Sequence, residues 1–160
     1  MDLKGQNILV TGASQGIGRA MARELMAKGA RVVVHYNSHR QEALDLISEY
    51  PETGSIALQA AMDQPEEVIK LFEESVRQLG RLHTLVVNAG IFPPHKVSGD
   101  TNAWWEVWRR TLAVNLDAAG LLTKLGITHF QSEGGGRFIY IGSRAAFRGE
   151  TEDFLAYAAS

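Results

Sequence analysis

Cysteine is absent from the sequence, and its absence excludes several kinds of chemistry. Disulfide bonds, thiolate nucleophiles and cysteine-ligated metal centres all need a residue that the chain does not contain. The five histidines, at positions 35, 39, 83, 95 and 129, do not cluster with acidic residues. His35 and His39 are four residues apart, but the apolar run at 31–36 ends between them, so they do not share the face of a helix. We therefore expect no metal site.

Strong charge of either sign is also absent, and so are long apolar runs. The formal net charge of −2 over 160 residues gives no electrostatic reason to expect nucleic acid or an anionic membrane surface as a partner. No apolar stretch approaches the roughly 18 residues of a membrane span. The opening residues "MDLKGQNILV" lack the basic start and long apolar run of a secretory signal. These absences predict a soluble, cytoplasmic protein. The length of 160 residues predicts a single domain, residues 1–160.

Short apolar segments alternate with amphipathic segments along the chain. Continuous apolar runs typical of strands buried on both faces lie at 7–11, 31–36, 55–61, 82–90 and 137–143. Helical spacing occupies 16–28, 39–50, 63–80 and about 101 to 131, and Asp63 is the expected N-cap of the third helix. The alternation predicts an α/β fold, a Rossmann-type doubly wound parallel sheet with helices on both faces, truncated after the fifth strand.

Three of the sixteen glycines gather where the first predicted strand gives way to the first predicted helix, in "VTGASQGIGRA". Gly12 can make the tight exit from the strand, Gly16 can leave room for a pyrophosphate, and Gly18 can let the helix pack closely. A phosphate pair can lie against a helix N-terminus only where no Cβ obstructs its approach. The cluster lacks a P-loop lysine, which argues against a nucleotide triphosphatase. A glycine-rich turn without a ligand is the alternative interpretation.

The pattern TG-x-x-x-G-I-G after a first strand resembles the short-chain dehydrogenase/reductase family, and the other motifs of that family follow in order. "NAG" ends the fourth predicted strand, Asn115 lies in "AVNLDAAG", Ser143 ends "YIGS", and Tyr157 follows on the last predicted helix. Asp63, after the third strand, matches the family's acid beside the adenine ring. The matches extend over the whole chain. The segment "FIYIGSRAAFRGE" also resembles bacterial members described as 3-oxoacyl-carrier-protein-reductase-like (3-oxoacyl-ACP-reductase-like).

The resemblance implies an oxidoreductase that reduces a carbonyl or oxidises an alcohol by hydride transfer with NAD(P)(H). It assigns Tyr157 as the acid/base, Ser143 as the hydroxyl that orients the substrate oxygen, and Asn115 as the holder of a water in a proton relay. Taken alone, Ser143 could be a turn residue and Tyr157 a packing residue. Because asparagine is a poor residue for a helix interior, Asn115 also predicts a local distortion of the long helix.

The same resemblance predicts where a dinucleotide binds. No acid stands at the end of the second strand, where NAD-dependent members usually carry one for the ribose hydroxyls. Ser38 and Arg40 suit a 2′-phosphate instead, so we expect NADP(H) in preference to NAD(H), although Arg40 could simply be a solvated residue at a helix start. The expected cofactor-binding residues are Gly12, Ser14, Gln15, Gly16, Ile17, Gly18, Tyr36, Asn37, Ser38, Arg40, Asp63, Asn88, Ala89 and Gly90.

Three tryptophans mark the start of the long helix. Trp108 follows Trp105 and Trp104 by three and four residues, a spacing typical of a core or a subunit interface. In the family this helix packs against its counterpart in a neighbouring subunit, so the resemblance implies a homo-oligomer, either a dimer or a tetramer. The other partner that it implies is a small-molecule carbonyl or alcohol substrate.

The last residues, "AYAAS", fill the first four places of the family's Y-x-x-x-K pattern, from Tyr157 to Ser160. In the family, the lysine of the fifth place is the cation that lowers the pKa of the tyrosine, which is about 10 in the free residue. We therefore expect the N-terminal part of a longer chain, an open edge on the fifth strand, and little reductase activity from the 160 residues alone. The alternatives are a non-catalytic dinucleotide-binding sensor or partner subunit, and an epimerase or dehydratase of the family's extended branch.

Overall fold

The apolar runs pair into one parallel sheet in the computed structural model, which describes residues 2–160. The strands are β1 (Asn7–Val10), β2 (Arg31–Tyr36), β3 (Ile56–Gln59), β4 (Thr84–Val87) and β5 (Arg137–Tyr140). Their order in the sheet is β3-β2-β1-β4-β5, and every neighbouring pair is parallel. The order reverses at β1, so the carboxyl ends of β1 and β4 flank the switch point where sheets of this kind bind ligands.

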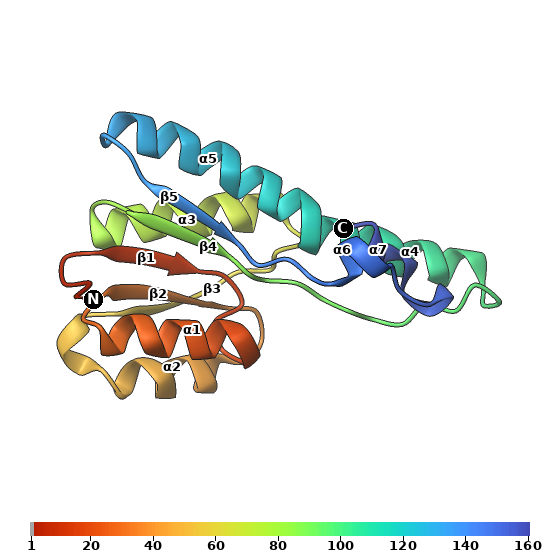
Figure 1. Cartoon of the computed structure of the whole chain (residues 1–160), viewed down its shortest axis with the longest axis horizontal. Helices are drawn as coiled ribbons and strands as arrows, with labels where there is room; N and C mark the ends of the chain where they lie inside the picture. Colours follow the sequence, from red (N-terminus) through yellow and green to blue (C-terminus); the bar gives the residue numbers. More distant parts are fainter. Residues whose placement is uncertain (1) are drawn as a thin grey trace.

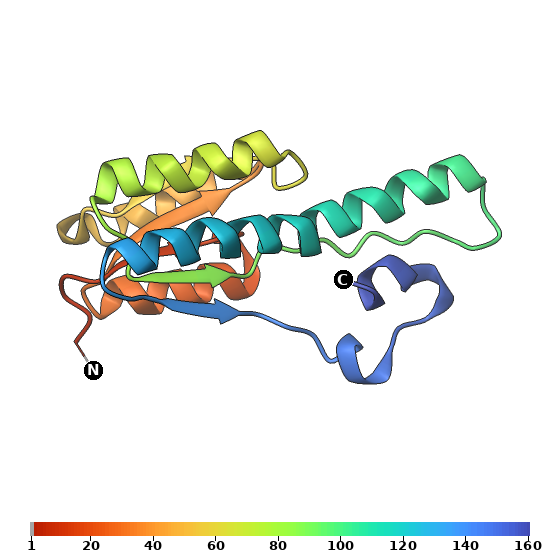
Figure 2. The ribbon, with the colours of Figure 1, turned by 90° about the horizontal axis from the view of Figure 1, so that it is seen from above.

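Helices cover both faces of the sheet, which confirms the predicted doubly wound fold (Figure 1). On one face lie α1 (Gly16–Ala27) and α2 (Arg40–Ser48), and on the other lie α3 (Pro65–Leu79) and α5 (Ala118–Ser132). The helix α4 (Thr101–Leu112) extends α5 beyond the sheet, as Figure 2 shows. The short helices α6 (Ala145–Arg148) and α7 (Leu155–Ala158) end the chain, and α7 packs against α4. Two 3₁₀ turns, Pro51–Thr53 and Glu152–Phe154, and a π-helical turn, Ala113–Asp117, which joins α4 to α5, complete the elements described for residues 2–160.

The two faces of the central strands bury different side chains. Leu9 and Val33 belong to the apolar cluster that includes α3 and α5, whereas their neighbours Val10 and Val34 belong to the cluster that includes α1 and α2. Side chains alternate between the faces of a strand, so a strand that is covered on both sides needs apolar residues at successive positions. The continuous runs in the sequence follow from this packing.

The ends of several elements differ from the sequence-based predictions. The predicted third, fourth and fifth strands all continue past the last paired residue, because the chain leaves the sheet there to form the loops of the site. The prediction that Asp63 caps α3 is wrong. The N-cap is Gln64, whose side chain makes no capping hydrogen bond, and the Asp63 carboxylate pairs with Arg110 of α4 instead.

The strand β5 forms one edge of the sheet, as predicted. It pairs with β4, and the side chains of Ile139 and Tyr140 are about half exposed. An edge strand with exposed apolar residues can accept a further pairing partner. Within residues 2–160, no helix combines the length and the apolar character that crossing a membrane would require.

The burial pattern of α5 gives a direct test of this packing. Leu122 is 0% exposed, whereas Lys124 on the same helix is exposed. Leu122→Ala removes buried methyl groups and leaves a cavity, so we expect the free energy of unfolding to fall by about 2–5 kcal/mol. The matched control Lys124→Ala should stay within about 0.5 kcal/mol of the parent protein. Urea unfolding followed by circular dichroism measures both, and equal losses from the two variants would contradict the packing.

Candidate functional site

A cavity of about 590 Å³ opens at the carboxyl ends of β1, β2 and β4, at the switch point of the sheet. Every expected cofactor-binding residue lines it except Tyr36 and Arg40. Six further lining residues escaped the sequence analysis: His35, His39, Met62, Ile91, Arg110 and Val114. Most of these six lie outside any recognisable motif, and only the fold brings them to the cavity.

The conformation of the glycine turn requires glycine at two positions, Gly12 and Gly18. Gly12 has a φ of +64°, a left-handed conformation that residues with a Cβ rarely adopt, and this conformation turns the chain out of β1. A Cβ added at Gly18 would overlap the Gly12 carbonyl oxygen and would lie 2.5 Å from Asn88 Nδ2. The first turn of α1 therefore packs directly on the ends of β1 and β4.

The N-terminus of α1 is open. Gln15 is its N-cap, but the Gln15 side chain makes no capping hydrogen bond, and no acidic residue lies in the first turn. An ideal Cβ at Gly16 would meet no atom within 4 Å, so free space lies beside that backbone. The first N–H groups of a helix have no partner within the helix and attract anions. These features fit the pyrophosphate of a dinucleotide.

Thr11 and Asn88 join the end of β1 to the end of β4. The Thr11 hydroxyl oxygen accepts hydrogen bonds from the backbone N–H groups of Asn88 (2.9 Å) and Ala89 (3.0 Å). Asn88 Nδ2 donates to the carbonyl oxygens of Thr11 (2.8 Å) and Gly12 (3.2 Å). The "NAG" segment therefore shapes the glycine turn as well as lining the cavity.

His35 holds the same turn from the β2 side. Its side chain is 1% exposed, Nδ1 accepts a hydrogen bond from the Gly12 N–H (2.9 Å), and Nε2 lies 3.0 Å from the Ala60 carbonyl oxygen. Burial lowers the pKa of His35, and the Ala60 carbonyl opposes that shift. The imidazole is therefore neutral near neutral pH, and Nδ1 is free to accept. A titratable residue inside the apolar run "RVVVHY" is the signal that could have identified it.

The end of β2 carries polar groups and no carboxylate. Asn37, Ser38 and His39 are exposed and line the cavity. Tyr36 is buried instead, in the apolar cluster that includes α1 and α2, so its side chain does not reach the cavity. Arg40 is exposed at the first position of α2, just outside the lining.

Asp63 lies at the cavity wall with a partner that the sequence did not indicate. Arg110 Nε of α4 is 3.2 Å from Asp63 Oδ2, and both side chains are partly exposed. Solvent screens such a pair, so it contributes little to stability. The ion pair instead fixes the position of the loop before α3 relative to α4, since it joins two residues that are 47 positions apart in the sequence.

Asn115 lies in the π-helical turn Ala113–Asp117, between α4 and α5, which confirms the predicted distortion of the long helix. Its Oδ1 accepts a hydrogen bond from the Ile91 N–H (2.8 Å), and its Nδ2 donates to the Ile91 carbonyl oxygen (3.1 Å) and to Ser160 Oγ (3.0 Å). Asn115 thus ties the long helix to the loop after β4 and to the end of the chain. Turns of this kind are frequent at functional sites.

Ser143 and Tyr157 lie beyond the end of β5, on the segment that contains α6 and α7. The Tyr157 ring packs edge-on against Phe92 with centroids 4.6 Å apart, and Phe92 stacks on Phe154 at 4.0 Å. Ser143 Oγ accepts a hydrogen bond from the Ala145 N–H (3.2 Å). Neither Ser143 nor Tyr157 lines the cavity at the glycine turn. The structure therefore places them in a region adjoining the loop after β4 and does not join them directly to each other.

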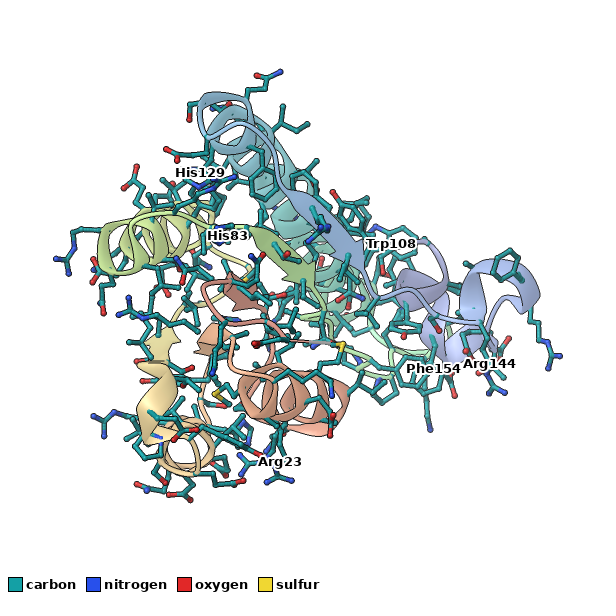
Figure 3. The ribbon with its side chains drawn as sticks, turned by 60° about the vertical axis from the view of Figure 1, so that its left-hand side comes forward. Arg23, His83, Trp108, His129, Arg144 and Phe154 are labelled. Carbon is teal, nitrogen blue, oxygen red and sulfur yellow. The ribbon has the colours of Figure 1, made fainter. Side chains whose placement is uncertain are left out.

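A buried histidine of the loop after β4 holds the segment that carries Tyr157. The backbone N–H of His95 donates to the Asp153 carbonyl oxygen (2.8 Å), and His95 Nε2 accepts from the Ala156 N–H (3.2 Å). Its ring also lies 5.3 Å from the ring of Trp104 on α4. Phe154 marks this segment on the right of Figure 3.

Comparisons with known proteins agree with this geometry. Hydroxynaphthalene reductase-like protein Arp2 of Metarhizium robertsii is 34% identical over 162 residues, which cover 99% of this chain and 58% of the relative. A short chain dehydrogenase from Burkholderia cenocepacia in complex with NADP is 31% identical with a TM-score of 0.87, over 99% of this chain and 64% of that one. A 7α-hydroxysteroid dehydrogenase complexed with NADH is 27% identical with a TM-score of 0.86, over 99% of this chain and 61% of that one.

The chain therefore spans about three fifths of the length of these proteins. The sequence model of the short chain dehydrogenase family matches residues 6–160, which is nearly all of the chain. The sheet order, the glycine turn and the ordered motifs agree with that match. The chain belongs to the short-chain dehydrogenase family.

Proposed function

We propose that the protein is an NAD(P)(H)-dependent oxidoreductase that reduces a carbonyl or oxidises an alcohol by hydride transfer. The observation that carries the proposal is the uncapped N-terminus of α1, whose first residues line a cavity of about 590 Å³. Ligand pockets commonly have volumes of about 300–1,000 Å³. Membership of the short-chain dehydrogenase family supports the same function.

Different residues of the cavity would bind different parts of the proposed cofactor. The N–H groups of residues 15–18 would hold the pyrophosphate, Asn37 and Ser38 would hold the ribose next to the adenine, and Asp63 would lie beside the adenine ring. Residues 88–90 would line the nicotinamide half. When bound, the cofactor supplies the hydride, and the protein supplies orientation and proton handling.

Tyr157 and Ser143 are the proposed groups for the substrate oxygen. Tyr157 Oη would hold the proton that this oxygen gains or loses, and Ser143 Oγ would donate a hydrogen bond to it. A free tyrosine has a pKa of about 10, so transfer near neutral pH needs a cation close to Oη. Asn115 would hold a water in the proton relay. Its contacts with Ile91 and Ser160 also fix the position of the π-helical turn relative to Tyr157.

We propose NADP(H) as the preferred cofactor. The cavity wall at the end of β2 presents the donors of Asn37 and Ser38 and no carboxylate, and Arg40 begins the next helix. A 2′-phosphate gains charge-assisted hydrogen bonds from such groups, whereas a carboxylate would repel it. The similar solved structures include an NADP complex and an NADH complex, so the preference rests on the residues of this chain.

We also propose a homo-oligomer, formed through the outer surface of α4 and α5. The helices α4 and α5 and the π-helical turn between them form one continuous helical segment. Three of its apolar side chains are about half exposed: Trp105, Leu116 and Ile127. Exposed apolar residues that gather on one surface mark interaction sites. The cytoplasmic location, the dimer or tetramer, and the resemblance to 3-oxoacyl-carrier-protein reductases stay predictions.

Gly18→Ala tests the glycine turn in the full-length protein. The new methyl group collides with the Gly12 carbonyl oxygen, so the start of α1 must shift. We expect the Kd for NADPH, measured by isothermal titration calorimetry, to rise by about tenfold or more. Gly120→Ala on α5 is the matched control, because its Cβ would meet no atom within 4 Å. Equal affinities of the two variants would contradict the proposed position of the pyrophosphate.

The cofactor preference is tested by titrating NADPH and NADH side by side. We expect NADPH to bind more tightly by about tenfold, which corresponds to about 1.4 kcal/mol. Arg40→Ala should weaken NADPH binding and leave NADH binding unchanged, because NADH has no 2′-phosphate. Lys70→Ala, an exposed cation of α3 away from the cavity, is the control. A clear preference for NADH would refute the assignment.

Tyr157→Phe tests catalysis in the full-length protein. Loss of the hydroxyl removes the proton donor, so we expect kcat for carbonyl reduction to fall by about 10²-fold or more while the Kd for the dinucleotide is unchanged. Tyr140→Phe is the matched control, since Tyr140 Oη pairs with Thr123 Oγ at the edge of the sheet. Unchanged turnover in Tyr157→Phe would favour the alternative of a dinucleotide-binding sensor or partner subunit.

A further inference from the structure

We propose that His35 is a positioning residue of the dinucleotide site, which holds the Gly12 N–H through Nδ1 and so fixes the glycine turn in the form that receives the cofactor. The inference rests on the proposed dinucleotide-binding function. It concerns a residue outside the motifs of the sequence analysis, which lines the cavity but is only 1% exposed.

The register of the sheet explains why the turn needs a side-chain acceptor. The β1–β2 ladder runs from Asn7 opposite Arg31 to Val10 opposite Val34. Beyond it, the Ala13 N–H donates to the His35 carbonyl oxygen (2.8 Å). Gly12 lies between these two pairings in a left-handed conformation, and its N–H points to the imidazole of His35 instead of to a carbonyl of β2. His35 thus replaces a missing ladder partner.

The peptide unit between Thr11 and Gly12 is held at both of its polar ends. Its carbonyl oxygen accepts a hydrogen bond from Asn88 Nδ2 (2.8 Å), and its N–H donates to His35 Nδ1 (2.9 Å). The first hydrogen bond comes from Asn88, at the end of β4, and the second comes from His35, on β2. Rotation of this peptide would displace the Gly12 carbonyl oxygen, against which Gly18 packs. The position of the first turn of α1 therefore depends on both hydrogen bonds.

The hydrogen bonds also determine the tautomer of His35. Because Nδ1 accepts from the Gly12 N–H, the proton of the neutral ring lies on Nε2, where the Ala60 carbonyl oxygen accepts it (3.0 Å). A neutral acceptor suits this place better than a carboxylate, which would put negative charge beneath a site for phosphates. Asp63 and Arg110 on the same cavity wall are paired with each other.

Two amide substitutions separate the two hydrogen bonds of the ring. His35→Asn places an oxygen near the position of Nδ1 and keeps the acceptor for Gly12. His35→Gln places its amide near the position of Nε2 and keeps the donor for Ala60, but it loses the acceptor for Gly12. We expect His35→Asn to bind NADPH within about threefold of the parent protein, and His35→Gln to bind about tenfold more weakly.

Nuclear magnetic resonance of the full-length protein without ligand gives an independent readout. The ¹⁵N shifts of His35 should show an unprotonated Nδ1. The amide proton of Gly12 should move in His35→Gln by more than in His35→Asn. Leu122→Ala controls for general destabilisation, because it removes core packing on α5, which contributes no residue to the cavity lining, and it should leave both the Gly12 resonance and the Kd unchanged.

The outcomes separate this inference from the proposed function. Parent-like affinity in His35→Gln, or equal weakening in His35→Gln and His35→Asn, would overturn the role of Nδ1. A protonated Nδ1 in the ligand-free protein would overturn it as well. If the parent protein binds neither NADPH nor NADH, the proposed function fails, and the resonances of Gly12 and His35 still decide whether the ring holds the turn.

Discussion

The close packing of α1 on the ends of β1 and β4 is the constraint on which the site depends. No side chain separates Gly18 from the Gly12 carbonyl oxygen, and Asn88 reaches the same carbonyl from the neighbouring strand. The start of the helix is therefore fixed relative to two central strands, each buried on both faces. Its unpaired N–H groups lie where the strand order reverses, and a fixed helix start at that place can bind an anion without first becoming ordered.

The loop after β4 connects this cavity to the residues that we propose for proton transfer. Ile91 is held by Asn115 of the π-helical turn, Phe92 packs against Tyr157, and His95 holds the backbone on either side of Phe154. The long helix contributes to both regions, through Arg110 at the cavity wall and Asn115 beneath the loop. A change in this loop would therefore affect the position of Tyr157 and the cavity wall together.

Sequence reasoning succeeded where local pattern and fold agree. The apolar runs predicted the strands, the glycine spacing predicted the turn, and the unfavourable Asn115 predicted the distortion of the helix. It failed where a partner is distant in sequence. Asp63 was expected to cap a helix, yet Arg110, which lies 47 residues away, pairs with it. His35 and Arg110 were missed because their partners become evident only when the strands and helices are assembled. Tyr36 was expected among the cofactor-binding residues, but it packs in the apolar cluster that includes α1 and α2 and does not line the cavity.

The hydrogen bonds between Thr11 and Asn88 have a consequence for the order of folding. They join residues 77 positions apart, and the His35 bond to Gly12 spans 23 positions. The glycine turn is thus one of the first segments to be synthesised but one of the last to gain its contacts, since closing so long a loop must wait for β4 to dock beside β1. On the ribosome, a nascent chain that ends before β4 can form the His35 bond to Gly12 but not the bonds with Asn88 and Ala89, so the complete glycine turn would arise only after the fourth strand has emerged.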